Sequence, residues 1–428
     1  MINSEDKKLI FLLESILLIL PISLIFSNLI SEILIFLIIV IFFTQLKKDE
    51  IEKILNNKIF IFLFLITIYL AINYLLNISK ESSFTRSIFF IRFPLYVISL
   101  SYFLNKNYIN KKKIFFAWGF IVFLICLDLL LQNSTGKNIL GYEHVPQGEI
   151  NRLGGLLNDE LKIAYILNNL FVISLGSIFL YAQKNIYSLS IILFLTILVL
   201  YSVYLTGERS NFISLVLFVT VFFTFSNLRK YFITILIILI PIMVIKFSSS
   251  ENNPKIHRMF TENIKNIKES LVINKEENFL YKDNHYFAHF STALQIFQDY
   301  PIIGVGLKNF RKYCNNPNYD EKIYPSFRNR KCATHPHNIY FEIMSELGAV
   351  GIIIFFGSFL YIFYIFLETY IKKKNIFVLG NTIILMTFFI PFIPKGSFFT
   401  NWTAMIFWTV FAINCHLISK KNRYSKEN

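Results

Sequence analysis

Apolar residues occur along the chain in long runs that are separated by short charged segments. A run of about 17–22 apolar residues is long enough to cross a bilayer as a helix. The sequence contains twelve such runs, near residues 9–27, 28–45, 59–77, 87–104, 114–132, 161–182, 187–205, 211–226, 232–248, 348–369, 376–394 and 402–419. The pattern predicts an all-α polytopic membrane protein with about 12 transmembrane helices in a single domain, residues 1–428.

Composition supports a membrane protein. Hydrophobic residues make up 55% of the 428 residues, and Phe alone accounts for 48. A soluble chain of this size would expose much of that surface to water, which excludes an ordinary soluble domain. The net charge of +15 would suggest nucleic acid as a partner of a soluble protein. Here membrane lipids are the expected surroundings, and no nucleic-acid partner is expected.

The distribution of basic residues predicts the orientation of the helices. With the N-terminus inside and the helices alternating, the inner segments carry 20 Lys and Arg residues. The short outer loops carry four, namely Lys80, Arg86, Arg209 and Lys395. Because basic residues concentrate in cytoplasmic loops, both termini are predicted to be cytoplasmic.

Two outer segments, residues 133–160 and 249–338, are too long to be simple connections. In the second, apolar residues recur with helical spacing, which predicts an amphipathic helix that ends before Pro301: Tyr286, Phe287, Phe290, Ala293, Leu294 and Phe297. Gly304 and Gly306 then form a turn. The helix either lies at the membrane interface above a cavity or packs on the top of the bundle. We therefore expect a large, partly helical outer loop.

Charged residues converge on the outer face of the predicted bundle. Charges inside a membrane are costly and usually face an internal cavity. Glu32, Arg92 and Asp128 all fall in the outer halves of their helices. Other charged residues lie in the outer loops themselves: Arg209 follows Glu208 in a tight turn, and the first long outer loop contains Arg152, Asp159 and Glu160.

Residues 308–331 carry seven basic and two acidic residues, and Arg311 is one of the basic ones. For most of these residues a solvated charged surface is the simpler interpretation. Together with Arg152 and Arg209, however, the segment suits an anion such as phosphate or pyrophosphate. The planar guanidinium group offers such an anion a fork of donors.

His337 precedes Asn338, which can cap the tenth predicted helix. A helix N-terminus favours a bound anion and disfavours imidazolium, so a neutral His337 ring could accept a proton. The alternative is a histidine with only structural hydrogen bonds. His335 is at most a supporting residue. Gly348 and Gly351 share a helix face and are expected to allow close packing.

The four cysteines show no Cys-x-x-Cys spacing, and we find neither a metal-ligand pattern nor a nucleotide-binding glycine loop. No metal and no cofactor are therefore expected. Cys314 and Cys332 share one polar loop and could form a disulfide if that loop faces an oxidising compartment. Cys126 and Cys415 lie in apolar runs and are expected to be packing residues.

These residues resemble a known family, the O-antigen ligases and the related O-antigen polymerases. The ligase signature is His-Asn, nine residues, Gly, two residues and Gly, and residues 337–351 fit it at every fixed position. Residues 299–310 are similar to the Pro…Gly-x-Gly…Asn-Phe stretch of the family. Arg209 is similar to the outer-turn arginine, although Ile213 stands where the family often has Leu. Residues 152–160 also look like a family segment, so the resemblance covers roughly residues 140–355.

The resemblance implies a metal-independent, inverting glycosyltransferase on the periplasmic side of the bacterial inner membrane. The donor would be a glycan on undecaprenyl pyrophosphate. A ligase transfers it to a lipid A core sugar, and a polymerase transfers it to another carrier-linked repeat. His337 would activate or position the acceptor hydroxyl, and Arg209 would neutralise the pyrophosphate. Further residues would help to bind the pyrophosphate or support the site: Arg152, Arg311, Asn338, His335, Glu208, Asp159, Glu160, Gly304 and Gly306.

Two other functions remain open from the sequence. The acceptor could be a protein, as in a protein O-oligosaccharyltransferase. A transporter of lipid-linked glycans is the alternative from a different class, and it predicts charged residues through the full membrane thickness and repeated halves. Neither feature is evident in the sequence.

Overall fold

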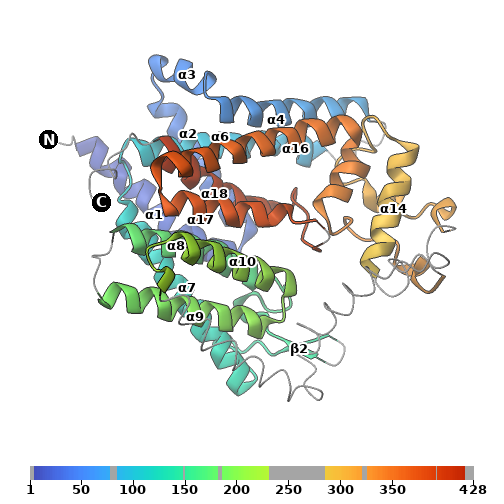
Figure 1. Cartoon of the computed structure of the whole chain (residues 1–428). Coiled ribbons are helices and arrows are strands. Elements are labelled where there is room, and N and C mark those ends of the chain that lie inside the picture. Colours follow the sequence, from blue (N-terminus) through green and yellow to red (C-terminus); the bar gives the residue numbers. More distant parts are fainter. Residues whose placement is uncertain are drawn as a thin grey trace.

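The computed structural model describes residues 4–77, 84–147, 150–181, 186–230, 285–320, 325–391 and 393–419 (Figure 1). Within them, seven helices are long and apolar enough to cross a membrane: α1 (Ser4–Phe26), α2 (Asn28–Gln45), α4 (Lys58–Leu76), α7 (Lys111–Thr135), α9 (Ile186–Thr206), α16 (Ile339–Lys373) and α18 (Asn401–Ser419). Four more apolar helices are α6 (Arg92–Asn105), α8 (Ile163–Tyr181), α10 (Arg209–Phe225) and α17 (Ile376–Met386), whose apolar segments are 10–17 residues long.

The remaining elements are short and lie mostly in the connections. The helices are α3 (Lys48–Leu55), α5 (Phe84–Ser87), α14 (His285–Asp299) and α15 (Phe310–Tyr313). The 3-10 turns are η1 (Phe89–Ile91), η2 (Gly155–Leu157), η5 (Pro317–Tyr319), η6 (Pro325–Arg330) and η7 (Thr387–Phe389). Strands β1 (Val145–Gln147) and β2 (Ile150–Arg152) form an antiparallel pair in which Val145 is opposite Arg152.

The prediction of a largely helical chain with several membrane-spanning helices is confirmed. Eleven of the predicted apolar runs overlap these helices, and the ninth, residues 232–248, lies outside the described residues. So does the first part of the second long outer loop, residues 249–284. The prediction for residues 376–394 was too long, because the helix and its 3-10 turn end at Phe389. Pro391 and Pro394 follow, and proline cannot continue a helix.

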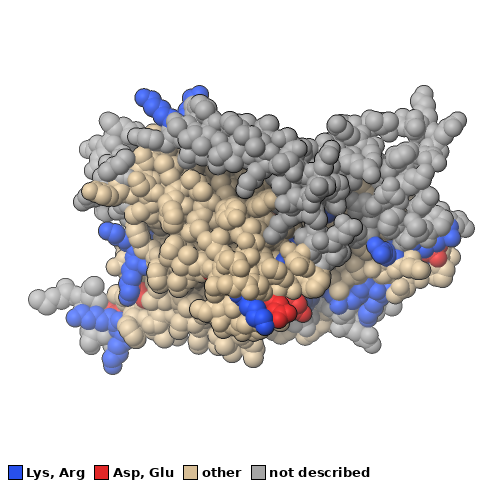
Figure 2. Space-filling view, turned by 90° about the horizontal axis from the view of Figure 1, so that it is seen from below, with Lys and Arg blue, Asp and Glu red and all other residues tan. Residues whose placement is uncertain are grey.

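The helix ends form two groups at opposite ends of the bundle, which runs from left to right in Figure 1. At one end, the first residues of α4 and the last residues of α6, α16 and α18 line one cavity. At the other end, the starts of α10 and α16 and the segment before α18 are joined by hydrogen bonds of Lys395. Figure 2 shows that Lys and Arg gather towards both ends, with a mostly uncharged surface between them.

Helix α18 forms the centre of the bundle. Of its most apolar stretch, 89% is buried, and it packs on α6, α17 and α8. Its Trp408 is fully buried and lies edge-on to Phe398 and Phe407, with ring centroids 5.8 and 5.2 Å away. Such aromatic pairs add to the free energy of burial, so they hold the residues before and within α18 together.

The three charges predicted in the outer halves of their helices also stabilise the bundle. The guanidinium of Arg92 donates to Glu32 at 3.0 and 3.1 Å and to Asn401 at 3.0 Å, which ties α6 to α2 and α18. The Asp128 carboxylate accepts the backbone N–H of Ile139 at 2.9 Å and so anchors the first long outer loop on α7. These charges therefore hold neighbouring helices, and the loop after α7, in place.

Helix α14 covers the start of α16. Its bounds, His285–Asp299, agree closely with the amphipathic helix predicted at residues 286–297. The Phe290 ring stacks on Phe341, with centroids 4.5 Å apart and an interplanar angle of 9°. Ala293 and Ile296 are buried, whereas Leu294, which was predicted on the same apolar face, is 37% exposed. Helix α14 thus packs on α16, which fits the second of the two interpretations of this helix.

Gly348 breaks α16 near its first third. Its backbone has φ 68° and ψ −167°, a conformation that only glycine adopts readily. Residues 301–306 run beside the break: Val305 N–H donates to Ser345 O at 3.0 Å, and Ala349 N–H donates to Pro301 O at 2.8 Å. The expectation that Gly348 only permits close helix packing was therefore wrong. At Gly348 the backbone groups of α16 form hydrogen bonds with residues 301–306 instead of continuing the helical pattern.

Replacing Gly348 with Ala should destabilise the protein by about 2–5 kcal/mol, the combined cost of strain and overpacking. An added Cβ would lie 2.4 Å from Ile302 O and 2.6 Å from Gly304 N. Thermal unfolding of the purified protein measures the effect. Gly357→Ala in the same helix is the matched control, because its Cβ would meet nothing within 4 Å. Equal unfolding midpoints for the two variants would contradict a strained break.

Cys314 and Cys332 form a disulfide with Cα atoms 5.3 Å apart, closing a loop with a sequence separation of 18. Cys314 packs with Ala293, Ile296 and Phe310 in a small apolar cluster under α14. Loss of the bridge should cost about 3 kcal/mol in the chain-entropy description. Mass spectrometry of unreduced, unfolded protein should find free thiols only at Cys126 and Cys415. Four reactive thiols would argue against the bridge.

Candidate active site

The tight turn between α9 and α10 holds two of the predicted arginines together. Arg209 is the first residue of α10 and is half-buried. Arg152, at the end of β2, is buried, and its Nε donates to Thr206 O at 3.2 Å. Gly207 has φ 70°, and a Cβ there would lie 3.4 Å from the Arg152 side chain. The glycine thus allows the turn to bend sharply beside Arg152.

Glu208 is buried beneath this turn. Its carboxylate accepts the backbone N–H of Ala164 at 3.2 Å and the side-chain amide of Asn211. Burial raises the pKa of Glu208 to about 7, and the nearby Arg152 charge counteracts that rise. Glu208 therefore joins the turn to α8 and α10.

His337 occupies the position just before the N-terminus of α16. Asn338 caps this helix, since its side-chain oxygen accepts the backbone N–H of Tyr340 at 2.9 Å. The capping expected from the sequence is therefore present. His337 is half-buried and has φ 59°, in the left-handed region. This backbone turn directs the chain from the preceding loop into the helix.

Two histidine rings and a tyrosine ring surround His337. The ring centroid of His337 is 4.2 Å from that of His335 and 5.5 Å from those of His289 and Tyr286. Burial lowers the pKa of His289, whose Nδ1 lies 3.1 Å from Lys331 O. Burial also lowers the pKa of His335 to about 4, although the Glu342 charge opposes this shift. The surroundings of His337 therefore hold neutral imidazoles near pH 7.

A buried ion pair lies directly below the histidines. Lys308 Nζ is 3.2 Å from a carboxylate oxygen of Glu342, and the two side chains are 6% and 1% exposed. Ser397 bonds to both groups, and Phe398 N–H donates to Glu342 at 3.2 Å. Lys308 was expected in the basic, anion-binding segment, but its ammonium group is used inside the protein. The pair joins the Gly304–Gly306 turn, α16 and the segment before α18.

Lys395 links the histidines to the helix that begins at Arg209. Its backbone N–H donates to His337 O at 2.7 Å, and its own carbonyl lies 3.3 Å from His335 Nε2. Its ammonium group, on a side chain 9% exposed, donates to Ser214 of α10 at 2.7 Å. Lys395 therefore connects the residues around His337 to α10, the helix that begins at Arg209.

The free energy of unfolding should increase with pH because the buried ammonium group of Lys395 loses its proton. Burial lowers its pKa from 10.5 to about 7, so between these values the folded protein binds fewer protons than the unfolded chain. The penalty for a buried charge is full below this window and is relieved as the pH increases through it. Unfolding midpoints measured across the window should rise for the wild type, and the rise should be smaller in Lys395→Met. Exposed Lys112 provides the control, Lys112→Met. The same rise in Lys395→Met would contradict the assignment.

The other predicted residues lie apart from these contacts. Asp159 and Glu160 are exposed, and Glu160 pairs with Lys162. Arg311 is exposed on α15. Burial lowers the pKa of Arg86 on α5, and the charges of Arg92 and Arg311 lower it further. The structure thus brings Arg152, Glu208 and Arg209 together, and His335, His337 and Asn338 together. It does not place the exposed residues Asp159, Glu160 and Arg311 in either set.

Sequence reasoning missed Lys395, His289 and the Lys308–Glu342 pair. Lys395 had a signal, since it is a lone charge in a short apolar turn after two prolines. His289 lies on the apolar side of the predicted amphipathic helix, where a polar residue is unusual. Partners 34 residues apart, such as Lys308 and Glu342, cannot be paired from one sequence. In the part of the chain that the structure describes, no three potential ligands are grouped to hold a metal ion.

The fold and the site define a multi-pass membrane protein with a polar, partly basic site at one end of its helical bundle. Residues 194–356, which include Arg209, α14, His337 and the break at Gly348, match the family model described as O-Antigen ligase. The resemblance seen in the sequence is therefore confirmed over residues 194–356, and this match supports the O-antigen ligase and polymerase family. Members of this family are glycosyltransferase-like enzymes that act on lipid-linked glycans.

No curated protein matches the sequence significantly. Among solved structures, a similar chain comes from the structure titled "Structural coordination of polymerization and crosslinking by a peptidoglycan synthase complex". The two chains are 10% identical with a TM-score of 0.44, over 83% of this chain and 96% of the other.

Proposed function

We propose that the protein is an O-antigen ligase that transfers a glycan from undecaprenyl pyrophosphate to a sugar hydroxyl of the lipid A core. The observation that carries the proposal is the link, through Lys395, between His337 and α10, the helix that begins at Arg209. A histidine at a helix N-terminus and two arginines lie at the same end of the bundle. The ligase spacing from His337–Asn338 to Gly348 and Gly351 adds support.

In this mechanism, neutral His337 accepts the proton of the acceptor hydroxyl or orients that hydroxyl. The hydroxyl oxygen attacks the anomeric carbon of the donor as the bond from that carbon to the pyrophosphate oxygen breaks, with inversion. The leaving pyrophosphate carries the negative charge, which Arg209 and Arg152 stabilise with charge-assisted hydrogen bonds. No metal or cofactor is part of the proposal, because the activated donor supplies the free energy.

The proposed topology has about 12 transmembrane helices with both termini in the cytoplasm and the active site facing the periplasm of the inner membrane. Support comes from the opposed ends of the bundle, since the candidate site lies at the end away from the last residues of α6, α16 and α18. The excess of 20 basic residues over four in the predicted inner and short outer segments supports the same orientation.

The lipopolysaccharide of a clean deletion strain tests the proposal and its alternatives. Loss of a ligase should leave bare core and accumulated carrier-linked polymer. A single repeat unit on the core would instead identify a polymerase, which belongs to the same family. Unchanged lipopolysaccharide with altered glycoproteins would point to a protein transferase and would overturn the ligase assignment.

A further inference from the structure

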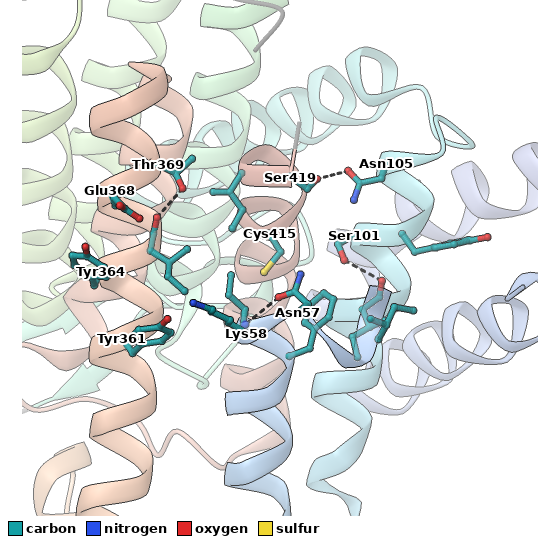
Figure 3. A pocket seen from close by; sticks show the side chains of 17 residues that line it. Asn57, Lys58, Ser101, Asn105, Tyr361, Tyr364, Glu368, Thr369, Cys415 and Ser419 are labelled. Carbon is teal, nitrogen blue, oxygen red and sulfur yellow. Dashed lines mark hydrogen bonds between the residues drawn. The ribbon is translucent and has the colours of Figure 1, made fainter. Parts of the chain in front are cut away.

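A cavity of about 710 Å³ lies at the end of the bundle opposite to His337 (Figure 3). It is enclosed by the start of α4, the last turns of α6, the last third of α16 and the end of α18. Helix α16 is 35 residues long, so its two ends are separated by about 50 Å. None of the residues that line the cavity belongs to the candidate active site.

One side of the cavity is apolar and continues onto the lateral surface of the bundle. Ile59, Phe60, Ile98, Ile365 and Ile418 contribute aliphatic and aromatic surface. Beside the cavity, exposed residues of α4 and α16 are also apolar: Ile61 is 42% exposed and Leu360 70%. In a membrane this flank faces lipid, so an amphiphile can enter from the side.

The other side offers hydrogen-bond donors that have no partner among the described residues. Lys58 extends from α4 towards Tyr361 and Tyr364 of α16 (Figure 3). Neither the Lys58 ammonium nor either tyrosine hydroxyl makes a hydrogen bond within the described part of the chain. The neighbouring polar side chains are already bonded. Ser101 donates to Ile98 O at 3.0 Å, and Thr369 donates to Ile365 O at 2.8 Å.

The charge balance at this cavity favours an anion. The acidic residue that lines it, Glu368, accepts a hydrogen bond from Lys372 at 2.6 Å. Lys373 lies at the rim, where its ammonium donates to Ile418 O at 2.6 Å. Lys58 also stands in the first turn of α4, the positive end of the helix dipole. A phosphate group is the anion that suits a lysine and two hydroxyl donors in this setting.

We propose that this cavity binds an anionic glycerophospholipid, with its phosphate at Lys58, Tyr361 and Tyr364 and its acyl chains against the apolar side. Basic pockets between transmembrane helices commonly hold anionic lipid headgroups at the cytoplasmic surface. The apolar side selects a lipid over free phosphate. The proposal does not depend on the transfer reaction, because the two sites share no residue.

The test measures thermal unfolding of the purified full-length protein in detergent while dioctanoylphosphatidylglycerol is added. A ligand that binds only the folded state raises the unfolding temperature in a saturable manner. We expect such a rise with this lipid and a much smaller one with dioctanoylglycerol, dioctanoylphosphatidylcholine or inorganic phosphate. An equal rise with any of these three would overturn the proposal of an anionic phospholipid.

Two variants locate the binding. Lys58→Gln should weaken the apparent affinity about tenfold, as expected when one charged hydrogen bond is lost. The double variant Tyr361→Phe, Tyr364→Phe removes only hydroxyl groups and should also weaken it. Lys112→Gln changes an exposed lysine that does not line the cavity and should behave as the wild type. Wild-type affinity in both cavity variants would overturn the proposal.

Discussion

Replacing His337 with Asn is expected to reduce glycan transfer by about 10²–10⁴-fold, the usual contribution of a general base. The lipopolysaccharide of complemented deletion cells should then show bare core on a gel. Asn is the sharpest substitution because His337 has φ 59°, and Asn tolerates this left-handed region better than Ala does. The imidazole is lost while the entry into α16 is kept.

The matched control is His144→Asn. His144 is half-buried in the first long outer loop, with Nε2 2.8 Å from Gln132 O, and it is not part of the histidine cluster. This variant should ligate normally. Full ligation in His337→Asn at wild-type protein levels would rule out a role for the ring in proton transfer or acceptor positioning.

Replacing Arg209 with Gln should lower transfer by about 10²–10³-fold, as when one preorganised donor to a developing charge is removed. Arg209→Lys should recover part of the rate, because it restores the charge but not the planar fork. Both variants should insert normally, since Arg209 is half-buried at a helix start. Transfer rates with purified donor and acceptor measure the effect.

Arg229→Gln serves as the control for Arg209. Arg229 is exposed just after the other end of α10, away from the candidate site. Its loss should leave transfer unchanged. If Arg209→Gln and Arg229→Gln behaved alike, stabilisation of the pyrophosphate at the α9–α10 turn would have to be abandoned.

Much of the fold follows from hydrophobic runs and a few capping residues. The apolar runs predicted the helices because in lipid a helix satisfies its own backbone. Asn338 marked the start of α16, and the structure shows that Ser27 caps α2 by accepting the Ile30 N–H. The end of α17 was predicted too far along the chain, although Pro391 and Pro394 disfavour a helix through residue 394.

The interior of the site could not be read from the sequence. Gly348 looked like a helix-packing glycine because the segment that bonds to the residues on either side of it, residues 301–306, is more than 40 residues away. Lys308 counted as a surface charge until Glu342 and Ser397 were found around it. In the sequence, Lys395 was counted only as one of the four basic residues of the short outer loops. Each of these roles depends on a long-range contact, and charge or spacing alone does not specify such contacts.

Purified protein reconstituted with an undecaprenyl-pyrophosphate glycan donor and lipid A core acceptor tests the central claim most directly. The predicted result is a glycan-capped lipid A core whose new glycosidic bond has the opposite anomeric configuration to the donor. Product should form with the wild type and His144→Asn, and be lost with His337→Asn. A product with retained configuration, or wild-type product from His337→Asn, would contradict the account.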